Sequence, residues 1–159
     1  MREVLALITA MVVGITDGDT INIRDGNRNP YTVRLACIDA PETSQQPWGA
    51  IARDKLISLV PVGSGIRIKP IAKDMYGRTV AEVFTVQGDN INLRLVKDGF
   101  APVYRDYLQG CDRVAYLDAE SAARKSRYVF WSQENPIMPW NWRRTQRRLQ
   151  LGDYGDTIK

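Results

Sequence analysis

The sequence predicts an α+β fold, namely a five-stranded Greek-key β-barrel of the OB type with about three helices. Three observations indicate it. Five short apolar or alternating runs lie between residues 11 and 86, a helical pattern interrupts them after the third, and two further helical patterns follow. The 159 residues, 44% of them hydrophobic, suffice for one core, so we expect residues 11–142 to form a single domain.

The expected strands are rich in β-branched side chains and are bounded by turn residues. They span Met11–Thr16, Thr20–Arg24, Tyr31–Ile38, Ile66–Ile71 and Thr79–Val86. The sequence DGNRNP at positions 25–30 predicts a hairpin turn, because Asp-Gly and Asn accept positive φ. The second and third strands are therefore predicted to be antiparallel neighbours.

Three helices are predicted from apolar spacing and from residues that begin or end helices. They span Trp48–Val60, Asn92–Asp98 and Asp112–Lys125. Pro61 stops the first helix and Gly99 ends the second, while Asp112 is a candidate N-cap of the third.

The two ends of the chain differ in character. Residues 1–10 are expected to form a leader or an extension of the first strand, and their apolar run is too short to span a bilayer, so we expect no stable membrane insertion. Residues 143–159 are predicted to be a polar tail that is either solvated or able to contact phosphates. Its arginines fall within six residues: Arg143, Arg144, Arg147 and Arg148.

The composition excludes several kinds of chemistry. There is no histidine, which rules out Ser-His-Asp and Cys-His hydrolases, HExxH metalloproteases and histidine-activated nucleases. Two cysteines cannot build a four-thiolate zinc or iron–sulfur site. A formal charge of +4 and a pI near 9.2 are compatible with a polyanionic partner.

Four acidic residues lie in two tight clusters at the ends of predicted strands. Asp17 and Asp19 stand in the sequence TDGDT, and Asp39 and Glu42 in IDAPET. Carboxylates held at strand ends are able to bind a hard divalent cation, although either motif alone is equally typical of a solvated turn.

Two arginines add to this inventory. Arg34 lies in an otherwise apolar strand and Arg78 opens the last strand, and each could simply form a salt bridge. Carboxylates for a metal and two guanidinium groups are, taken together, what phosphodiester hydrolysis requires.

The order of the motifs resembles the staphylococcal nuclease (thermonuclease) family. The motifs are DGDT at 17–20, VRL at 33–35 leading into IDAPET at 38–43, YGR at 76–78 and LVKDGFA at 95–101. The resemblance extends from about Val12 to Trp131 and implies a thermonuclease-like hydrolase. Such an enzyme is a calcium-dependent phosphodiesterase that cleaves DNA and RNA with little sequence specificity, favours single strands and leaves 3'-phosphates.

The resemblance also assigns roles to individual residues. It implies that Asp19, Asp39 and the backbone carbonyl of Ala40 bind Ca²⁺, that Asp17 reaches the ion through water, and that Glu42 is the general base or orients the attacking water. It implies that Arg34 and Arg78 are catalytic arginines that contact the phosphate, and that Tyr76 and Tyr107 bind the substrate.

The cysteines leave two alternatives. In the fold implied by the resemblance, Cys37 on the third strand lies near Cys111 in a loop, so a disulfide is compatible with the sequence, as are two unpaired cysteines. A disulfide suits a secreted or periplasmic protein, and unpaired thiols a cytoplasmic one. We expect a monomer. The alternative function is a noncatalytic OB-type module that binds nucleic acid or a protein, but relatives of that kind lose the acidic residues that this chain retains.

Overall fold

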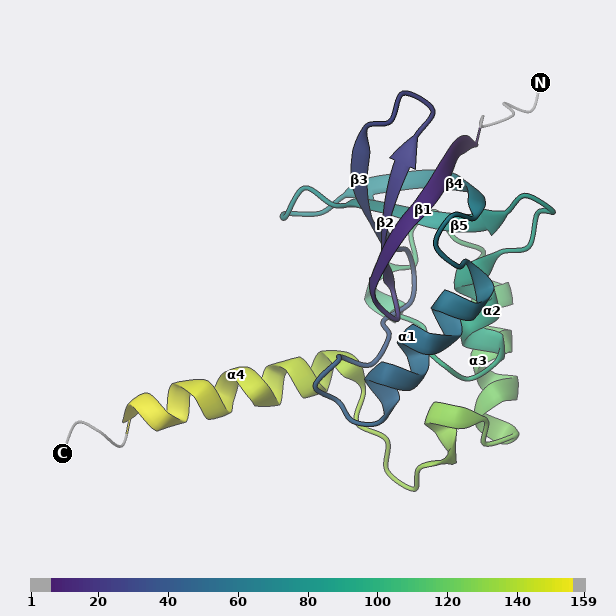
Figure 1. Ribbon diagram of the computed structural model, residues 1–159. Coiled ribbons are helices and arrows are strands. Elements are labelled where there is room, and N and C mark those ends of the chain that lie inside the picture. The colour runs from purple at the N-terminus through teal and green to yellow at the C-terminus, as the bar shows by residue number, and fades with distance from the viewer. Residues whose placement is uncertain (1–6, 156–159) are drawn as a thin grey trace.

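A computed structural model describes residues 7–155 of the chain, with a closed five-stranded barrel and helices packed below it (Figure 1). The strands are β1 (Ile8–Asp17), β2 (Thr20–Asp25), β3 (Pro30–Leu35), β4 (Gly65–Lys73) and β5 (Thr79–Thr85). The helices are α1 (Trp48–Leu59), α2 (Ile91–Lys97), α3 (Arg113–Lys125) and α4 (Pro139–Gly155), with 3-10 turns at Arg105–Tyr107 and Val129–Ser132. The predicted barrel is confirmed.

The barrel closes in the order β1-β2-β3-β5-β4. The predicted antiparallel hairpin of β2 and β3 is present, and β1 and β4 also pair antiparallel with their neighbours. The one parallel pair among the strands described joins β3 to β5 and aligns Arg34 with Val80. This pairing brings the beginning of β5, and so Arg78, next to the end of β3.

The third strand is shorter than predicted. The expectation that it runs to Ile38 is wrong, because β3 ends at Leu35. The Leu35 N–H donates to the Asp19 carbonyl at 2.8 Å, and Cys37 then takes a φ of 69°, in the left-handed region that a strand does not use. The chain therefore leaves the sheet just before Asp39.

The three predicted helices correspond to α1, α2 and α3. Asp112 caps α3 as predicted, since its side chain accepts a hydrogen bond from the Ala115 N–H at 3.1 Å. Asn90 caps α2 in the same way by accepting from the Leu93 N–H. Side-chain oxygens thus satisfy backbone N–H groups that have no partner within either helix.

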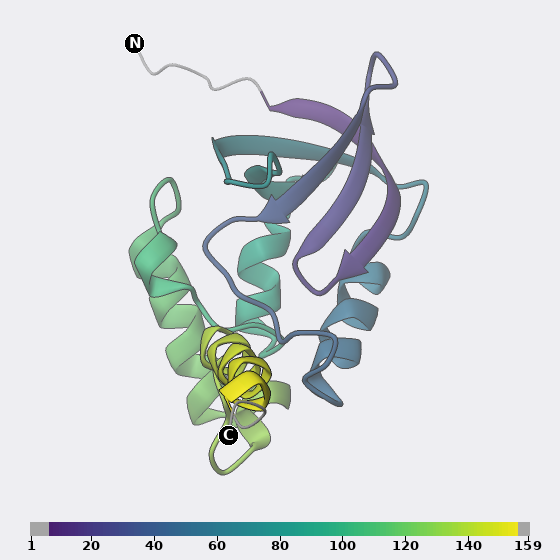
Figure 2. The same cartoon turned by 90° about the vertical axis from the view of Figure 1, so that its left-hand side faces the viewer.

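A fourth helix covers most of the segment expected to be a polar tail, whose last residues, 156–159, lie outside the described part of the chain. Residues 143–155 belong to α4, which extends away from the barrel (Figures 1 and 2). The beginning of α4 is anchored: the Trp140 ring stacks on Tyr104 at 5.4 Å, and the Trp142 Nε1–H donates to the Ser44 Oγ at 2.9 Å. These contacts hold the root of the helix against the segment that carries Asp39 and Glu42.

A disulfide and the first strand complete the fold. The disulfide joins Cys37 to Cys111, across 74 positions of sequence. Of residues 1–10, expected to be a leader or a strand extension, 8–10 belong to β1 and Leu7 precedes that strand, whereas 1–6 lie outside the described residues. None of the helices within 7–155 has the length and apolar character needed to cross a membrane.

Candidate functional site

The turn between β1 and β2 carries the first acidic pair. The Asp19 N–H donates to the Asp17 Oδ1 at 3.1 Å, and Asp19 is buried. Gly18, between them, faces α1 so closely that an added Cβ would lie 2.7 Å from the Cβ of Ala52. Glycine is therefore required for α1 to pack against this turn.

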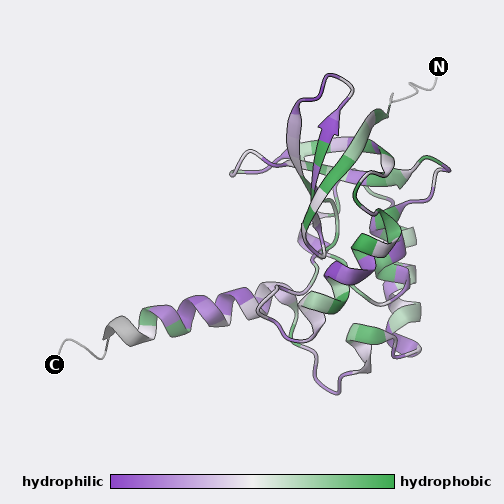
Figure 3. Ribbon diagram, viewed as in Figure 1, coloured by the Kyte–Doolittle hydropathy of each residue, from purple (hydrophilic) through white to green (hydrophobic). Residues whose placement is uncertain are grey.

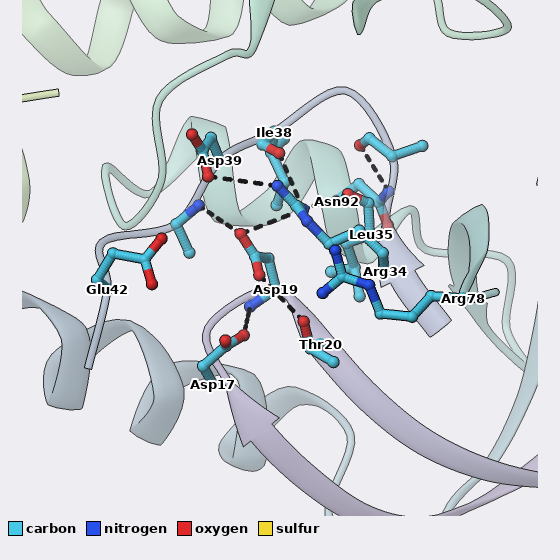
Figure 4. Close-up of polar contacts among 12 residues, drawn as sticks. Asp17, Asp19, Thr20, Arg34, Leu35, Ile38, Asp39, Glu42, Arg78 and Asn92 are labelled. Carbon is cyan, nitrogen blue, oxygen red and sulfur yellow. Dashed lines mark hydrogen bonds and ion pairs between the residues drawn. The ribbon is translucent and has the colours of Figure 1, made fainter. Parts of the chain in front are cut away.

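The segment after β3 brings Asp39 to the same place. Asp39 is only 1% exposed, and the N–H of the next residue, Ala40, donates to the Asp19 Oδ2 at 2.7 Å. Arg34 lies between the two carboxylates, with Nη1 3.1 Å from the Asp19 Oδ2 and Nη2 3.3 Å from the Asp39 Oδ1. The structure thus gathers Asp17, Asp19, Arg34 and Asp39 into one cluster, with Glu42 beside it (Figure 4). We call these five residues the acidic cluster.

Glu42 is positioned through its backbone by α1. Gly49, in the first turn of that helix, packs against the Glu42 carbonyl so tightly that any Cβ at position 49 would overlap it. The carboxylate of Glu42 is about one third exposed, in contrast to that of Asp39. Glu42 therefore borders both the buried acids and solvent.

Arg143 of α4 links Asp39 to Glu42. Its Nη1 and Nη2 lie 2.9 and 2.7 Å from the Oδ1 and Oδ2 of Asp39, and Nη1 also lies 2.6 Å from the Glu42 Oε1. Sequence reasoning missed this residue, which it placed in the tail. The arginine run at 143–148 was the available signal, but it does not indicate which arginine turns inward.

Burial dominates the electrostatics of the cluster. It raises the pKa of Asp39 to about 6, helped by the negative charge of Asp19, although hydrogen bonds from Arg143 oppose the shift. It also raises the pKa of Asp17 to about 7, again with a contribution from Asp19. The hydrogen bond to Asp39, in turn, raises the pKa of the Arg143 guanidinium above its ordinary value. The cluster therefore favours additional positive charge.

Arg78 lies next to Arg34, as the parallel pairing of β3 and β5 requires (Figure 4). Its Nε donates to the Asp74 Oδ2 at 2.6 Å, so Arg78 forms a salt bridge, the simpler of the two roles that the sequence allowed. Its guanidinium also lies 5.7 Å from the Tyr76 ring centroid. Tyr76 is 78% exposed. The Arg78 side chain is one third exposed.

Tyr107 occupies a different position from Tyr76. Its ring packs edge-on against Tyr104 at 4.5 Å, and Tyr104 in turn stacks on Trp140 of α4. Tyr107 is 61% exposed, and no hydrogen bond within residues 7–155 links it to the acidic cluster. The structure thus places Tyr107 beside Tyr104, which itself contacts α4, rather than among the acids.

The acidic cluster offers oxygen donors to a cation. As the side chains stand, residues 7–155 contain no group of three or more Asp, Glu, His or Cys residues arranged to hold a metal ion, and Arg143 lies between Asp39 and Glu42. The donor chemistry nevertheless fits. Asp19 and Asp39 supply buried carboxylate oxygens on either side of one arginine, and such oxygens suit a hard cation such as Ca²⁺.

Comparison with known proteins identifies the family. A family model described as staphylococcal nuclease homologue matches residues 32–133, more than half of the chain. The chain belongs to the staphylococcal nuclease family. It is accordingly a nuclease-type phosphodiester hydrolase, as its resemblance in sequence implied. The matched segment contains Arg34, Asp39, Glu42 and Arg78 but not α4.

Several curated relatives support this membership. The chain is 39% identical over 146 residues to an uncharacterized endonuclease of Haemophilus influenzae, covering 92% of this chain and 79% of the relative. It is 39% identical over 144 residues to a micrococcal nuclease of Shigella flexneri, covering 86% and 80%. It is also 32% identical over 166 aligned positions to the endonuclease YhcR of Bacillus subtilis, covering 90% of this chain but 13% of that longer protein.

Proposed function

We propose that this nuclease is a calcium-dependent phosphodiesterase that cleaves DNA and RNA with little sequence specificity, favours single strands and leaves 3'-phosphates. The observation that carries the proposal is the pairing of two buried carboxylates, Asp19 and Asp39, around Arg34 at the end of β3. Two buried carboxylates repel one another and lose hydration, and these costs, which Arg34 and Arg143 offset here, would also be offset by a bound cation.

Asp19, Asp39 and the carbonyl of Ala40 would hold the calcium ion, with Asp17 acting through water. Bound there, calcium supplies Lewis-acid stabilisation of the charge that builds on a phosphate. Burial raises the pKa of Asp39 because the ionised carboxylate is poorly hydrated there, and a cation beside it would stabilise that ionised form. Arg143 must release at least part of its contact with Asp39 for this to occur.

The remaining residues act on substrate and water. Glu42, at the exposed border of the cluster, orients or deprotonates the water that attacks phosphorus. Arg34 and Arg78 stabilise the phosphate oxygens as negative charge increases, since a guanidinium donates two parallel hydrogen bonds to a phosphate. Tyr76, exposed beside Arg78, offers a ring on which an unpaired base can stack. Tyr107 would add a second aromatic contact.

The surface charge supports a polyanionic substrate. Without the four acids of the cluster, 22 basic residues stand against 14 acidic ones, a balance that favours capture of a nucleic-acid backbone of any sequence. The Cys37–Cys111 disulfide supports an exported, secreted or periplasmic enzyme, because disulfides persist in oxidising compartments. We propose that it acts as a monomer.

The test is degradation of heat-denatured DNA and of RNA by the purified chain with calcium, with magnesium and with a chelator. The proposal expects calcium-dependent cleavage to 3'-phosphorylated fragments that is abolished by chelator and by Glu42→Ala. Glu134→Ala is a matched control, since Glu134 is an exposed acid outside the cluster. Salt-sensitive binding without cleavage under any of these conditions would instead indicate a noncatalytic binding module.

A further inference from the structure

The outer part of α4 carries three arginines that the fold does not use. Arg144, Arg147 and Arg148 are exposed, and at spacings of three and four residues they lie on one face of the helix. None of the ion pairs found within residues 7–155 includes any of them. Figure 3 shows that α4 is hydrophilic along most of its length beyond the root.

This arrangement is unfavourable for an isolated helix. Arg143 and Arg147, and likewise Arg144 and Arg148, are like charges four residues apart, which destabilise a helix by a few tenths of a kcal/mol per pair. The helix also extends away from the barrel, so packing contributes little beyond its root (Figures 1 and 2). A polyanion that binds along this face would remove the repulsion.

The root of α4 lies at the acidic cluster, so the arginine face begins next to the candidate site. Arg143 contacts Asp39 and Glu42 directly, so α4 begins at the acidic cluster. Arg147 lies one turn further along nearly the same side of the helix, about 6 Å away along its axis. The arginines therefore form a row that starts at the proposed point of cleavage and leads outward.

We propose that Arg144, Arg147 and Arg148 form a phosphate-binding arm that holds the part of a single-stranded polynucleotide flanking the scissile bond. This inference rests on the proposed nuclease function, which places the nucleic-acid strand at the acidic cluster. The surface itself lies outside the segment matched by the family model. The contacts are to the backbone phosphates, so the arm adds affinity for long strands and no base specificity. A substrate too short to extend from the cluster gains nothing from it.

The first test measures binding without turnover. Fluorescence anisotropy of a labelled 20-nucleotide oligothymidylate in chelator is compared between the wild-type chain and a variant with Arg144→Gln, Arg147→Gln and Arg148→Gln. We expect affinity to fall roughly tenfold or more at 50 mM salt. The slope of log affinity against log salt should become shallower by about 2, because each phosphate neutralised on a single strand contributes ~0.7 to that slope. A variant with lysine at the three positions should retain most of the affinity.

The matched control removes the same charge elsewhere. Arg67→Gln, Arg113→Gln and Lys125→Gln change exposed residues of β4 and α3. If this control lost as much affinity as the α4 variant, the effect would be one of net charge and the arm would be refuted. Unchanged affinity of the α4 variant, with circular dichroism showing that α4 is intact, would refute it equally.

The second test separates the arm from the proposed nuclease function. With calcium, the α4 variant should cleave long single strands at least tenfold less efficiently in kcat/KM but should cleave a dinucleotide at the wild-type rate. An equal loss on both substrates would overturn the arm. If the wild-type chain cleaved neither substrate, the nuclease proposal would fail, and the anisotropy experiment would still decide whether the arm binds polynucleotide.

Discussion

The guanidinium of Arg143 hydrogen bonds to both carboxylate oxygens of Asp39, although 104 positions of sequence separate the two residues. Asp39 is almost completely buried, and burial raises its pKa to about 6. A positive charge next to this carboxylate therefore strongly stabilises its ionised form. Arg143 and a calcium ion would supply that charge to the same oxygens, so the two are expected to compete.

Replacement of Arg143 should strengthen calcium binding. In Arg143→Gln the ion no longer has to displace a guanidinium, and we expect calcium affinity to rise about tenfold or more, which corresponds to roughly 1.4 kcal/mol. Isothermal titration calorimetry measures this, and Arg144→Gln is the neighbouring control. The same variant should lose stability without calcium and regain it with the ion, because ligand binding stabilises the folded state. Unchanged affinity in Arg143→Gln would show that Arg143 does not compete with the ion.

We expect that a lysine at position 34 cannot perform the role of Arg34. Arg34 contacts Asp19 and Asp39 and also donates to two backbone carbonyls, and a lysine ammonium cannot reproduce that set from one position. For Arg34→Lys we expect nuclease activity about a hundredfold lower, the usual scale for loss of one positioned donor. Initial rates on denatured DNA test this, with Arg24→Lys at an exposed position of β2 as the control. Equal rates in the two variants would argue against a role for Arg34 in the reaction.

The sequence predicted the barrel and most of the acidic cluster because their signals are local. Alternating strands, the turn at 25–30 and the ordered motifs around Asp19, Asp39 and Arg78 occupy short stretches of chain. Arg143 could not be found in this way. Its role depends on a helix packing against a loop about a hundred positions earlier, and an arginine run carries no periodic signal that distinguishes an inward side chain from a solvated one.

A buried asparagine was missed for a similar reason. Asn92 is fully buried in α2, where its Nδ2 donates to the carbonyls of Ala36 and Ala81 and its Oδ1 accepts from the Val83 N–H. In the sequence it is one polar residue near the start of a short helix. The structure shows that it ties α2 to β5 and to the segment that leads to Asp39.

Asn92→Ala should therefore be strongly destabilising. It would leave three buried backbone groups without their side-chain partner, and we expect a loss of about 2–4 kcal/mol in the free energy of unfolding. Urea denaturation measures the loss, and Asn27→Ala in the exposed turn after β2 is the control. A loss below about 1 kcal/mol would mean that water replaces the missing amide without a large cost.

The ion pair of Asp74 and Arg78 predicts a pH dependence of stability. Burial alone would raise the pKa of Asp74, but hydrogen bonds from the side chain and backbone of Arg78 outweigh it and hold that pKa below its ordinary value. Because the folded-state pKa lies below the unfolded one, the contribution to stability is present above about pH 4 and is lost as pH falls through the folded-state pKa. The pair is partly exposed, so we expect about 1 kcal/mol or less. Asp74→Asn should thus destabilise the chain at pH 7, and its difference in stability from the wild type should shrink as the pH falls below about 4. A difference that stays constant over this range would contradict this account.

Loss of the Cys37–Cys111 disulfide should destabilise the chain and disturb the acidic cluster. The bond closes a loop across 74 positions of sequence, and its removal is expected to cost about 2–4 kcal/mol because the unfolded chain gains conformational freedom. Cys37 precedes Asp39 by two residues, so the backbone that presents Asp39 to Arg34 and Arg143 would also lose an anchor. The double variant Cys37→Ala and Cys111→Ala should show the loss by urea denaturation and bind calcium more weakly. Titration of the unfolded, unreduced wild-type chain should detect no free thiol, and two reactive thiols would instead show that the bond does not form.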